Sequence, residues 1–226
     1  MGWPGGWSDP TSRSTTRSFP LASALGDQIY LNELEDALAE IRRQTGLEKF
    51  ELVGMDACLM GHLEVLTALE PHARFAITSQ ETEPALGWAY AAFLSELTAN
   101  PGMDGADLGE AIVNSYIQED QRILDEQERA NLVGRGSLLN SLFGAAAVPS
   151  ASQVSSQMFQ NVTLSAVDLA VLPELLERFN DLTFTLQEAD QRYVAQARSY
   201  AQSFTSIFGK QVPPSYIDLG NFAQQV

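Results

Sequence analysis

The sequence FELVGMDACLMGHLEVLTAL, residues 50–69, decides the fold of this 226-residue chain. It opens with a short apolar run at residues 50–53, which predicts a β-strand. Leucines at positions 59, 63, 66 and 69 then recur at the spacing of one helical face and predict a helix. Asp56 and Cys58 fall between the two. The stretch therefore predicts a strand, a turn and a helix, with Cys58 at the junction.

Helical and strand patterns alternate on both sides of this unit. Upstream, the apolar spacing predicts a helix over Leu31–Thr45 that ends at Gly46. Downstream, the patterns predict strands over 74–79 and 162–167, helices over 89–97 and 108–123, and a long helix from 172 to about 208 that follows a capping Asp168 and breaks near Asp181. This alternation is typical of an α/β sheet with helices packed on it.

Two stretches depart from this pattern. Residues 1–28 hold prolines, glycines and a Ser/Thr cluster without apolar periodicity, so we expect a loop or linker there. Residues 119–160 lose the alternation and pass through an acidic run and a small-residue run, which indicates an insertion or a weakly ordered connection. With 45% apolar residues the chain is large enough for one core, so we expect a single domain over 29–226.

Composition and charge exclude several classes of protein. With 29 acidic and 13 basic residues the net charge is −16, which is the wrong sign for a nucleic-acid binder and favours cationic ligands. No apolar run approaches the roughly 18 residues that a membrane span needs. Cys58 is the single cysteine, which excludes an internal disulfide, and no Cys/His spacing predicts a zinc site.

Cys58 is the candidate nucleophile. A thiol where a strand meets a helix would feel unpaired amides and the positive end of the helix dipole, which favour the thiolate. The alternative is a small buried hydrophobic residue, which a lone free cysteine usually is. A nucleophilic cysteine also needs a base. Neither histidine is convincing, because His62 follows on the same predicted helix and His72 lies in a loop where we expect it to be solvated.

Four segments resemble one family of enzymes. MDACLMGHLEV (55–65), FAITSQETEPALGW (75–88), VTLSAVDL (162–169) and YIDLGNFA (216–223) are similar to the clostripain (C11) cysteine peptidases, which share the caspase-like fold. The resemblance spans residues 50–223, is strongest over 50–90 and is weak over 119–160. It implies a caspase-like α/β/α sandwich in a bacterial protein, and it leaves open whether that protein is secreted or held in the cell envelope.

By resemblance, Cys58 is the catalytic cysteine, and the catalytic histidine belongs to an upstream motif of the type His-Gly-x-Gly-Trp. Met1-Gly2-Trp3 is similar to the last three positions of that motif. We therefore expect the histidine and the first strands of the sheet to precede Met1, which leaves the sandwich incomplete. The expected mechanism is attack by the Cys58 thiolate, which forms an acyl-enzyme. This chain on its own would then be nearly inactive, because losing a catalytic partner costs several orders of magnitude in rate.

The resemblance also implies protein or peptide substrates that are cleaved after arginine or lysine. Asp56 is the expected floor of the pocket for that side chain, since a carboxylate pairs with a guanidinium through two hydrogen bonds. Its alternative is a turn or helix-capping role, which would stabilise the start of the following helix by about 1 kcal/mol. Glu81 and Thr82 are lesser candidates for the same pocket, and the alternative is that they lie in an ordinary solvated loop. Arg13 and Arg17 are candidate self-processing sites, and the alternative is a polar linker that contains two arginines by chance.

This chemistry requires no cofactor, and the resemblance allows calcium. The acidic cluster within residues 119–128 lacks the alternating ligand spacing of an EF-hand, so we interpret it as a solvated helix face and expect no metal site. Two other functions stay open. A non-catalytic binding module would keep the fold without the catalytic pair, and a redox-sensing thiol would use Cys58 at the strand-to-helix junction.

Overall fold

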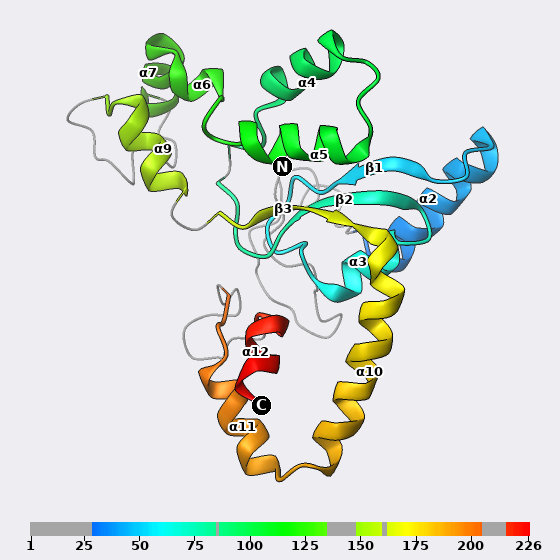
Figure 1. The fold of residues 1–226 in the computed structure, drawn as a ribbon. Helices are drawn as coiled ribbons and strands as arrows, with labels where there is room; N and C mark the ends of the chain where they lie inside the picture. Colours follow the sequence, from blue (N-terminus) through cyan, green and yellow to red (C-terminus); the bar gives the residue numbers. More distant parts are fainter. Residues whose placement is uncertain (1–28, 85, 135–147, 160–161, 205–215) are drawn as a thin grey trace.

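A three-stranded sheet lies at the centre of the computed structural model, which describes residues 29–84, 86–134, 148–159, 162–204 and 216–226. The sheet consists of β1 (Phe50–Gly54), β2 (Ala73–Ser79) and β3 (Leu164–Asp168), in that spatial order (Figure 1). β1 runs parallel to β2, whereas β3 runs antiparallel to it. β2 is therefore the central strand, and both of its faces need to be covered.

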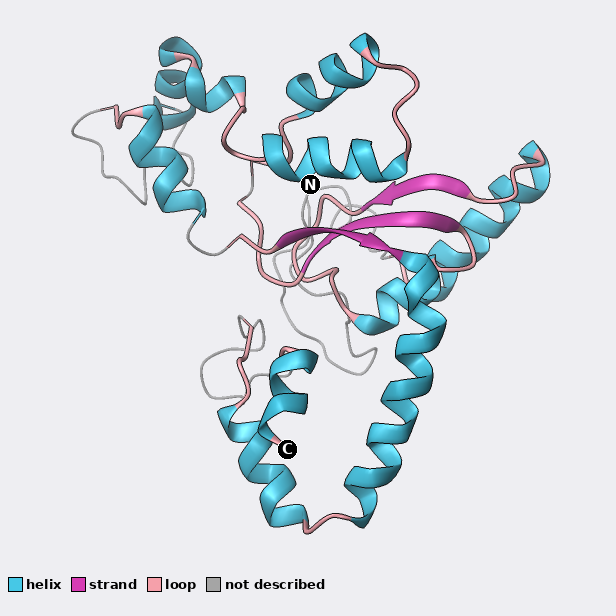
Figure 2. Cartoon of the chain, viewed as in Figure 1, coloured by secondary structure: helices cyan, strands magenta, loops and turns pink. Residues whose placement is uncertain are grey.

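Helices cover both faces of the sheet, as Figure 2 shows. One face packs against α2 (Leu31–Thr45) and α3 (Leu63–Leu69), and the other packs against α5 (Gly105–Ser115), on which α4 (Tyr90–Ala99) lies. Consecutive side chains of β2 point to opposite faces, so Ala76 belongs to the core under α2 and α3 and Ile77 to the core under α4 and α5. The predicted α/β/α sandwich is confirmed.

The helix bounds show where the sequence pattern holds and where it fails. α2 has the predicted bounds and ends at Gly46, whose φ of 72° lies in the left-handed region and whose amide donates to the Arg42 carbonyl. The predicted helix over 59–69 is wrong in its first four residues, because α3 begins at Leu63. Leu59 has a φ of 59°, which a right-handed helix does not permit.

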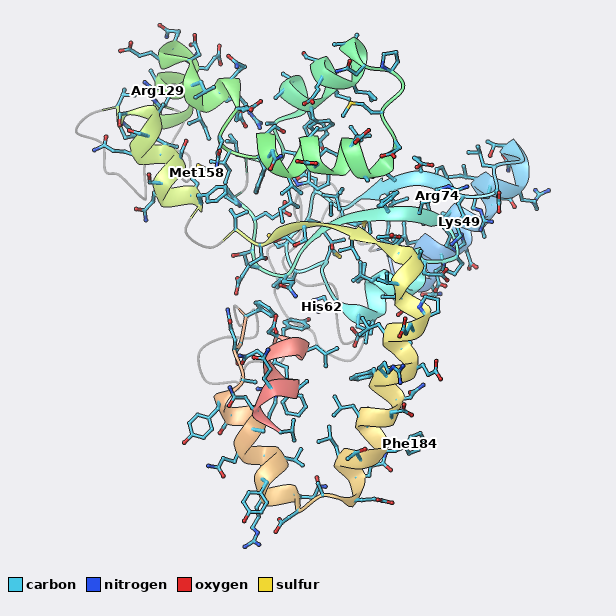
Figure 3. The ribbon with its side chains drawn as sticks, viewed as in Figure 1. Lys49, His62, Arg74, Arg129, Met158 and Phe184 are labelled. Atoms are coloured by element: carbon cyan, nitrogen blue, oxygen red, sulfur yellow. The ribbon has the colours of Figure 1, made fainter. Side chains whose placement is uncertain are left out.

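The described part of residues 119–160 contains three short helices beyond the end of α5: α6 (Gln121–Leu124), α7 (Glu126–Gly134) and α9 (Ala151–Phe159). The predicted helix over 108–123 is wrong as one piece, because α5 ends at Ser115 and Ile117 has a φ of 65°. Arg129, labelled in Figure 3, is buried and donates to the carbonyls of Ile123, Leu124 and Pro149. It therefore ties the three helices together. That this region is an insertion stays a prediction.

The C-terminal helices extend away from the sheet (Figure 1). Asp168 caps a short 3₁₀ helix (Leu169–Val171), as predicted, and α10 (Leu172–Glu188) follows. The chain then turns at Ala189 and Asp190, not at Asp181, and continues as α11 (Gln191–Tyr200) and α12 (Leu219–Gln225). α11 and α12 share a small core of their own. Among the described helices, none combines the length and the apolar character needed to cross a membrane.

Candidate active site

Cys58 lies in a turn at the carboxyl end of β1, beside the loop that follows β2. The Leu59 amide donates to the Glu81 carbonyl at 3.1 Å, which joins the two loops. The Cys58 sulfur accepts a hydrogen bond from the Glu83 amide at 3.2 Å, and its S–H faces the Glu83 carbonyl at 3.6 Å. The parallel pairing of β1 and β2 thus brings both loops to one edge of the sheet, where ligands of α/β proteins gather.

The predicted activation of Cys58 by a helix dipole is wrong. α3 begins five residues after Cys58, at Leu63, and the cysteine is only 8% exposed. Burial raises the pKa of the Cys58 thiol, and the negative charges of Glu83 and Asp56 add to the rise, while the hydrogen bond from the Glu83 amide opposes it. The resting group at neutral pH is therefore the thiol, and a base must remove its proton.

Asp56 is half-buried two residues before Cys58, and the loop after β2 holds its carboxylate. Its Oδ2 accepts hydrogen bonds from the Trp88 amide at 3.3 Å and from the Tyr90 hydroxyl at 3.0 Å. Gly87 permits this approach, because its φ is 74° and a β-carbon there would lie 2.9 Å from Oδ2. No side chain caps α3, so the predicted capping role of Asp56 is wrong. Its role in a substrate pocket stays a prediction.

Glu83 is the residue of this site that the sequence reasoning missed. It is 9% exposed, its Oε2 accepts a hydrogen bond from the Trp88 indole at 3.2 Å, and its carboxyl group hydrogen-bonds to Asp56. Burial, and then the charge of Asp56, raises the pKa of Glu83 to about 8. The loop sequence SQETEP contains two glutamates, Glu81 and Glu83, but nothing in their spacing indicates which of them is buried.

Arg122 fixes the loop that carries Trp88. Its guanidinium donates to the carbonyls of Leu86 at 2.7 Å, Gly87 at 3.4 Å and Trp88 at 3.0 Å, and it pairs with Asp120. Asp120 is buried and also caps α6 through the Arg122 amide. The interpretation of the acidic cluster as a solvated helix face is therefore wrong for Asp120, which binds the arginine that holds the Trp88 loop.

His72 lies too far along the sheet to serve as a base for Cys58. It precedes β2, at the amino end of the parallel strands, where its carbonyl accepts the Phe50 amide. Its ring is buried and lies 3.2 Å from the Arg42 guanidinium, so the expectation of a solvated histidine is wrong. Burial, and then the Arg42 charge, lowers the pKa of His72.

His62 lies just before α3, where Figure 3 labels it. Its ring packs against Tyr216 with 4.2 Å between ring centroids, and it hydrogen-bonds to the Leu59 backbone. Burial lowers the pKa of His62, so the ring is neutral at pH 7. Within the described residues, both hydrogen bonds of the Cys58 sulfur go to the backbone of Glu83 and neither goes to a histidine. His62 is thus a packing residue.

Of the remaining predicted site residues, two lie next to Cys58 and two lie outside the described part of the chain. Glu81 and Thr82 lie in the loop next to Cys58, where the Thr82 amide donates to Glu81 Oε2 at 3.1 Å and the Glu81 amide donates to Thr163 Oγ1 at 2.8 Å. Their part in a substrate pocket stays a prediction. The two candidate processing sites, Arg13 and Arg17, lie outside the described residues.

Two carboxylates of the acidic cluster already have partners within the protein. Asp120 pairs with Arg122, and Asp125 accepts the Glu128 amide at 2.9 Å, so both carboxylates already stabilise helix starts. In the part of the chain that the structure describes, no three acidic, histidine or cysteine side chains are grouped as metal ligands. A calcium requirement stays a prediction that rests on resemblance alone.

Comparisons with known proteins point to one family. A model described as the clostripain family, Peptidase C11, matches residues 4–131, which are 128 of the 226 residues. No curated protein gives a significant match. Three solved structures are similar to this chain. A B. fragilis cysteine protease is 16% identical over 88% of this chain, with a TM-score of 0.41. A clostripain from Bacteroides thetaiotaomicron in complex with the peptide inhibitor BTN-VLTK-AOMK is 17% identical over 88% of this chain, with a TM-score of 0.46, and a secreted C11 cysteine protease from Bacteroides thetaiotaomicron in complex with an irreversible peptide inhibitor is 18% identical over 66% of this chain, with a TM-score of 0.38. The chain spans 60% of the first structure's length, 66% of the second's and 33% of the third's.

Proposed function

The chain belongs to the clostripain family of cysteine peptidases, and on this premise we propose that it carries the nucleophile of a cysteine endopeptidase, Cys58. The observation that carries the proposal is the position of the sulfur. It lies at the carboxyl end of β1, held by the Glu83 amide at 3.2 Å, with the Asp56 carboxylate two residues away in the chain. A thiol, a backbone donor and an acidic side chain thus meet at the sheet edge where ligands of α/β folds bind.

In the proposed reaction, a base removes the Cys58 proton and the sulfur attacks the carbonyl carbon of the scissile peptide bond. The C–N bond then breaks as the base returns the proton to the leaving amine, and water hydrolyses the thioester that remains on the sulfur. Neither of the two histidines in the sequence hydrogen-bonds to the sulfur. We therefore expect the 226 residues on their own to hydrolyse peptides slowly.

We propose Asp56 as the residue that selects arginine or lysine before the cleaved bond, with Glu81 and Thr82 as lesser contributors. The support is electrostatic. Asp56 lies beside the nucleophile, is fixed by the Trp88 amide and the Tyr90 hydroxyl, and belongs to a chain of net charge −16. A carboxylate held in this way loses little freedom when it binds a guanidinium or an ammonium group.

Affinity labelling tests both parts of this proposal without requiring turnover. The chain is treated with two peptidyl chloromethyl ketones that end in arginine or in glutamate, and intact mass reports the labelling of its single cysteine. We expect the arginine probe to react at least about tenfold faster, because a charge-assisted hydrogen bond contributes about 1.5–3 kcal/mol. Asp56→Asn removes the preference, whereas Tyr90→Phe keeps the carboxylate and retains most of it. Equal labelling rates for the two probes on the native chain would contradict the specificity proposal.

A second function is a non-catalytic binding module, and the burial of Cys58 favours it. The thiol is 8% exposed, its pKa is raised by burial, and its hydrogen bonds are with a backbone. Under this alternative, the folded chain leaves Cys58 unlabelled by both probes at pH 7 while the unfolded chain reacts. Labelling of the folded chain by the arginine probe excludes it.

A further inference from the structure

Glu83 connects three groups of the proposed site. Its backbone amide donates to the Cys58 sulfur at 3.2 Å, and its Oε2 accepts the Trp88 indole N–H at 3.2 Å. Its carboxyl group also hydrogen-bonds to Asp56, which accepts hydrogen bonds from the Trp88 amide and the Tyr90 hydroxyl as well. One buried residue thus contacts the nucleophile, the proposed specificity carboxylate and the Trp88 indole.

The contact between Glu83 and Asp56 requires a proton. Two carboxylates have only acceptor atoms, so they can hydrogen-bond only when one of them is protonated. Glu83 is the more buried of the two, and one N–H donor, the Trp88 indole, hydrogen-bonds to its carboxyl group. Asp56, by contrast, accepts two donors that stabilise its charge, from Trp88 and Tyr90. The proton therefore belongs on Glu83.

The charges around the pair agree with this placement. The titratable groups nearby are Cys58, Tyr90 from α4, Tyr116 after α5 and Arg122 from α6. Burial raises the pKa of Tyr90 to about 12 and raises that of Tyr116 further, so both hydroxyls stay neutral. Arg122 is the one cation among these four described groups, and it is already bound to Asp120 and three carbonyls. Burial, then the Asp56 charge, raises the pKa of Glu83 to about 8.

We propose that Glu83 is the positioning residue of this site: as a neutral acid it donates to Asp56, accepts from Trp88, and through its amide holds the Cys58 sulfur. This inference rests on the proposed function. When Glu83 loses its proton, the hydrogen bond to Asp56 becomes a repulsion between like charges. The new charge also lies beside the sulfur and makes the thiolate harder to form. The state of one buried proton thus sets both the orientation of Asp56 and the reactivity of Cys58.

Two substitutions separate positioning from plain structural support. Glu83→Gln keeps a donor and an acceptor in nearly the same shape but cannot ionise, whereas Glu83→Leu keeps the volume and loses both hydrogen bonds. Glu64→Gln is the control, because it removes one negative charge from an exposed position on α3. The folded chains are alkylated with iodoacetamide from pH 6 to 10, and the labelling of the single cysteine gives the midpoint of thiol titration.

We expect Glu83→Gln to lower the alkylation midpoint by at least about half a pH unit, which is about threefold in rate on the rising limb, since it removes a charge that forms before the thiolate does. Glu64→Gln should leave the midpoint unchanged. At pH 6.5, Glu83→Gln should keep the preference for the arginine chloromethyl ketone, and Glu83→Leu should reduce it about tenfold or more.

Two results would overturn the inference: an alkylation midpoint in Glu83→Gln equal to that of the native chain, or a loss of arginine preference as large in Glu83→Gln as in Glu83→Leu. If the native chain shows no arginine preference at all, the specificity proposal fails. The alkylation midpoint of Glu83→Gln still decides the role of Glu83 in that case. The same measurement decides it if Glu83→Leu does not fold.

Discussion

The backbone amide of Glu83 lies 3.2 Å from the Cys58 sulfur, so the loop after β2 contacts the nucleophile that the loop after β1 presents. This relationship depends on the parallel pairing of two strands that the sequence separates by a short helix. It also explains why the thiol is buried, since the loop that supplies the amide covers the sulfur. Five residues later, Trp88 of the same loop binds Asp56 through its backbone amide.

The stability of the fold should depend on pH through Glu83. Its pKa is raised from 4.5 to about 8 in the folded chain, so between those values the folded state keeps a proton that the unfolded state has lost. The free energy of unfolding therefore falls as pH rises across this window, by up to about 1.4 kcal/mol per pH unit. Glu83→Gln should remove that slope, and urea unfolding at pH 5, 6.5 and 8 measures it. A stability difference between variant and native chain that stays constant with pH would contradict the assignment.

Gly87→Ala should damage both the fold and the site. A β-carbon at this position would lie 2.9 Å from Asp56 Oδ2, and the φ of 74° adds backbone strain. Gly46→Ala is a matched control, because Gly46 has a φ of 72° and nothing within 4 Å of the added atom. We expect about 1 kcal/mol of destabilisation for Gly46→Ala and about 2–3 kcal/mol for Gly87→Ala in urea unfolding. Equal costs would mean that the contact with Asp56 is unimportant.

Arg122→Ala should loosen the loop of Trp88. It removes three hydrogen bonds to carbonyls and leaves the buried Asp120 without its cation. Because the arginine side chain is 39% exposed, solvent screening limits the cost to about 2–3 kcal/mol. Arg192→Ala is the control, since it forms the same pair with a capping aspartate, Asp190, on an exposed helix and should change stability little. Urea unfolding and the probe preference of Cys58 measure the effect.

Self-processing at Arg13 or Arg17 is testable in an active form of the enzyme. If the peptidase cleaves its own N-terminal segment, Arg13→Ala with Arg17→Ala should remove the corresponding fragments in mass spectra. Cys58→Ala should abolish the same fragments without touching the cleavage sites. An unchanged set of fragments in the double arginine variant would place the processing elsewhere, and fragments that persist in Cys58→Ala would assign them to another protease.

The parts of the fold set by local pattern were predictable. α2 has the predicted bounds, because one apolar stripe, a left-handed glycine and a preceding extended residue agree at every position. β2 was found within one residue from its apolar run. The order of the three strands depends on long-range pairing and was not predictable from the pattern.

The errors at the site have two physical causes, tertiary hydrogen bonds and burial. Leu59 and Leu63 have helical spacing, but the Leu59 amide pairs with Glu81 and the Gly61 amide with Ser79. These tertiary hydrogen bonds hold the segment out of the helix and remove the expected dipole effect on Cys58. Burial was the second source of error, because it cannot be seen in the spacing of a polar loop. The contact between Glu83 and Cys58 was missed for this reason.

The break in the C-terminal helices was misplaced for a similar reason. Asp181 and Asp190 both look like helix starts in the sequence, and only the fold decides between them. Asp190 accepts the Arg192 amide at 2.9 Å and begins α11, whereas Asp181 lies inside α10. The helix break therefore follows the hydrogen-bonded cap and not the residue type.

We expect α11 and α12, which share a small core, to open more readily than the sheet. Among the residues that the structure describes, those buried in this core are Ala197, Ala201 and Phe222, far fewer than in either cluster on the sheet. Amide protons of these helices should consequently exchange with solvent as one group, and sooner than those of β2. Heat would then open the molecule from this end first, while the strands that carry the nucleophile keep their pairing.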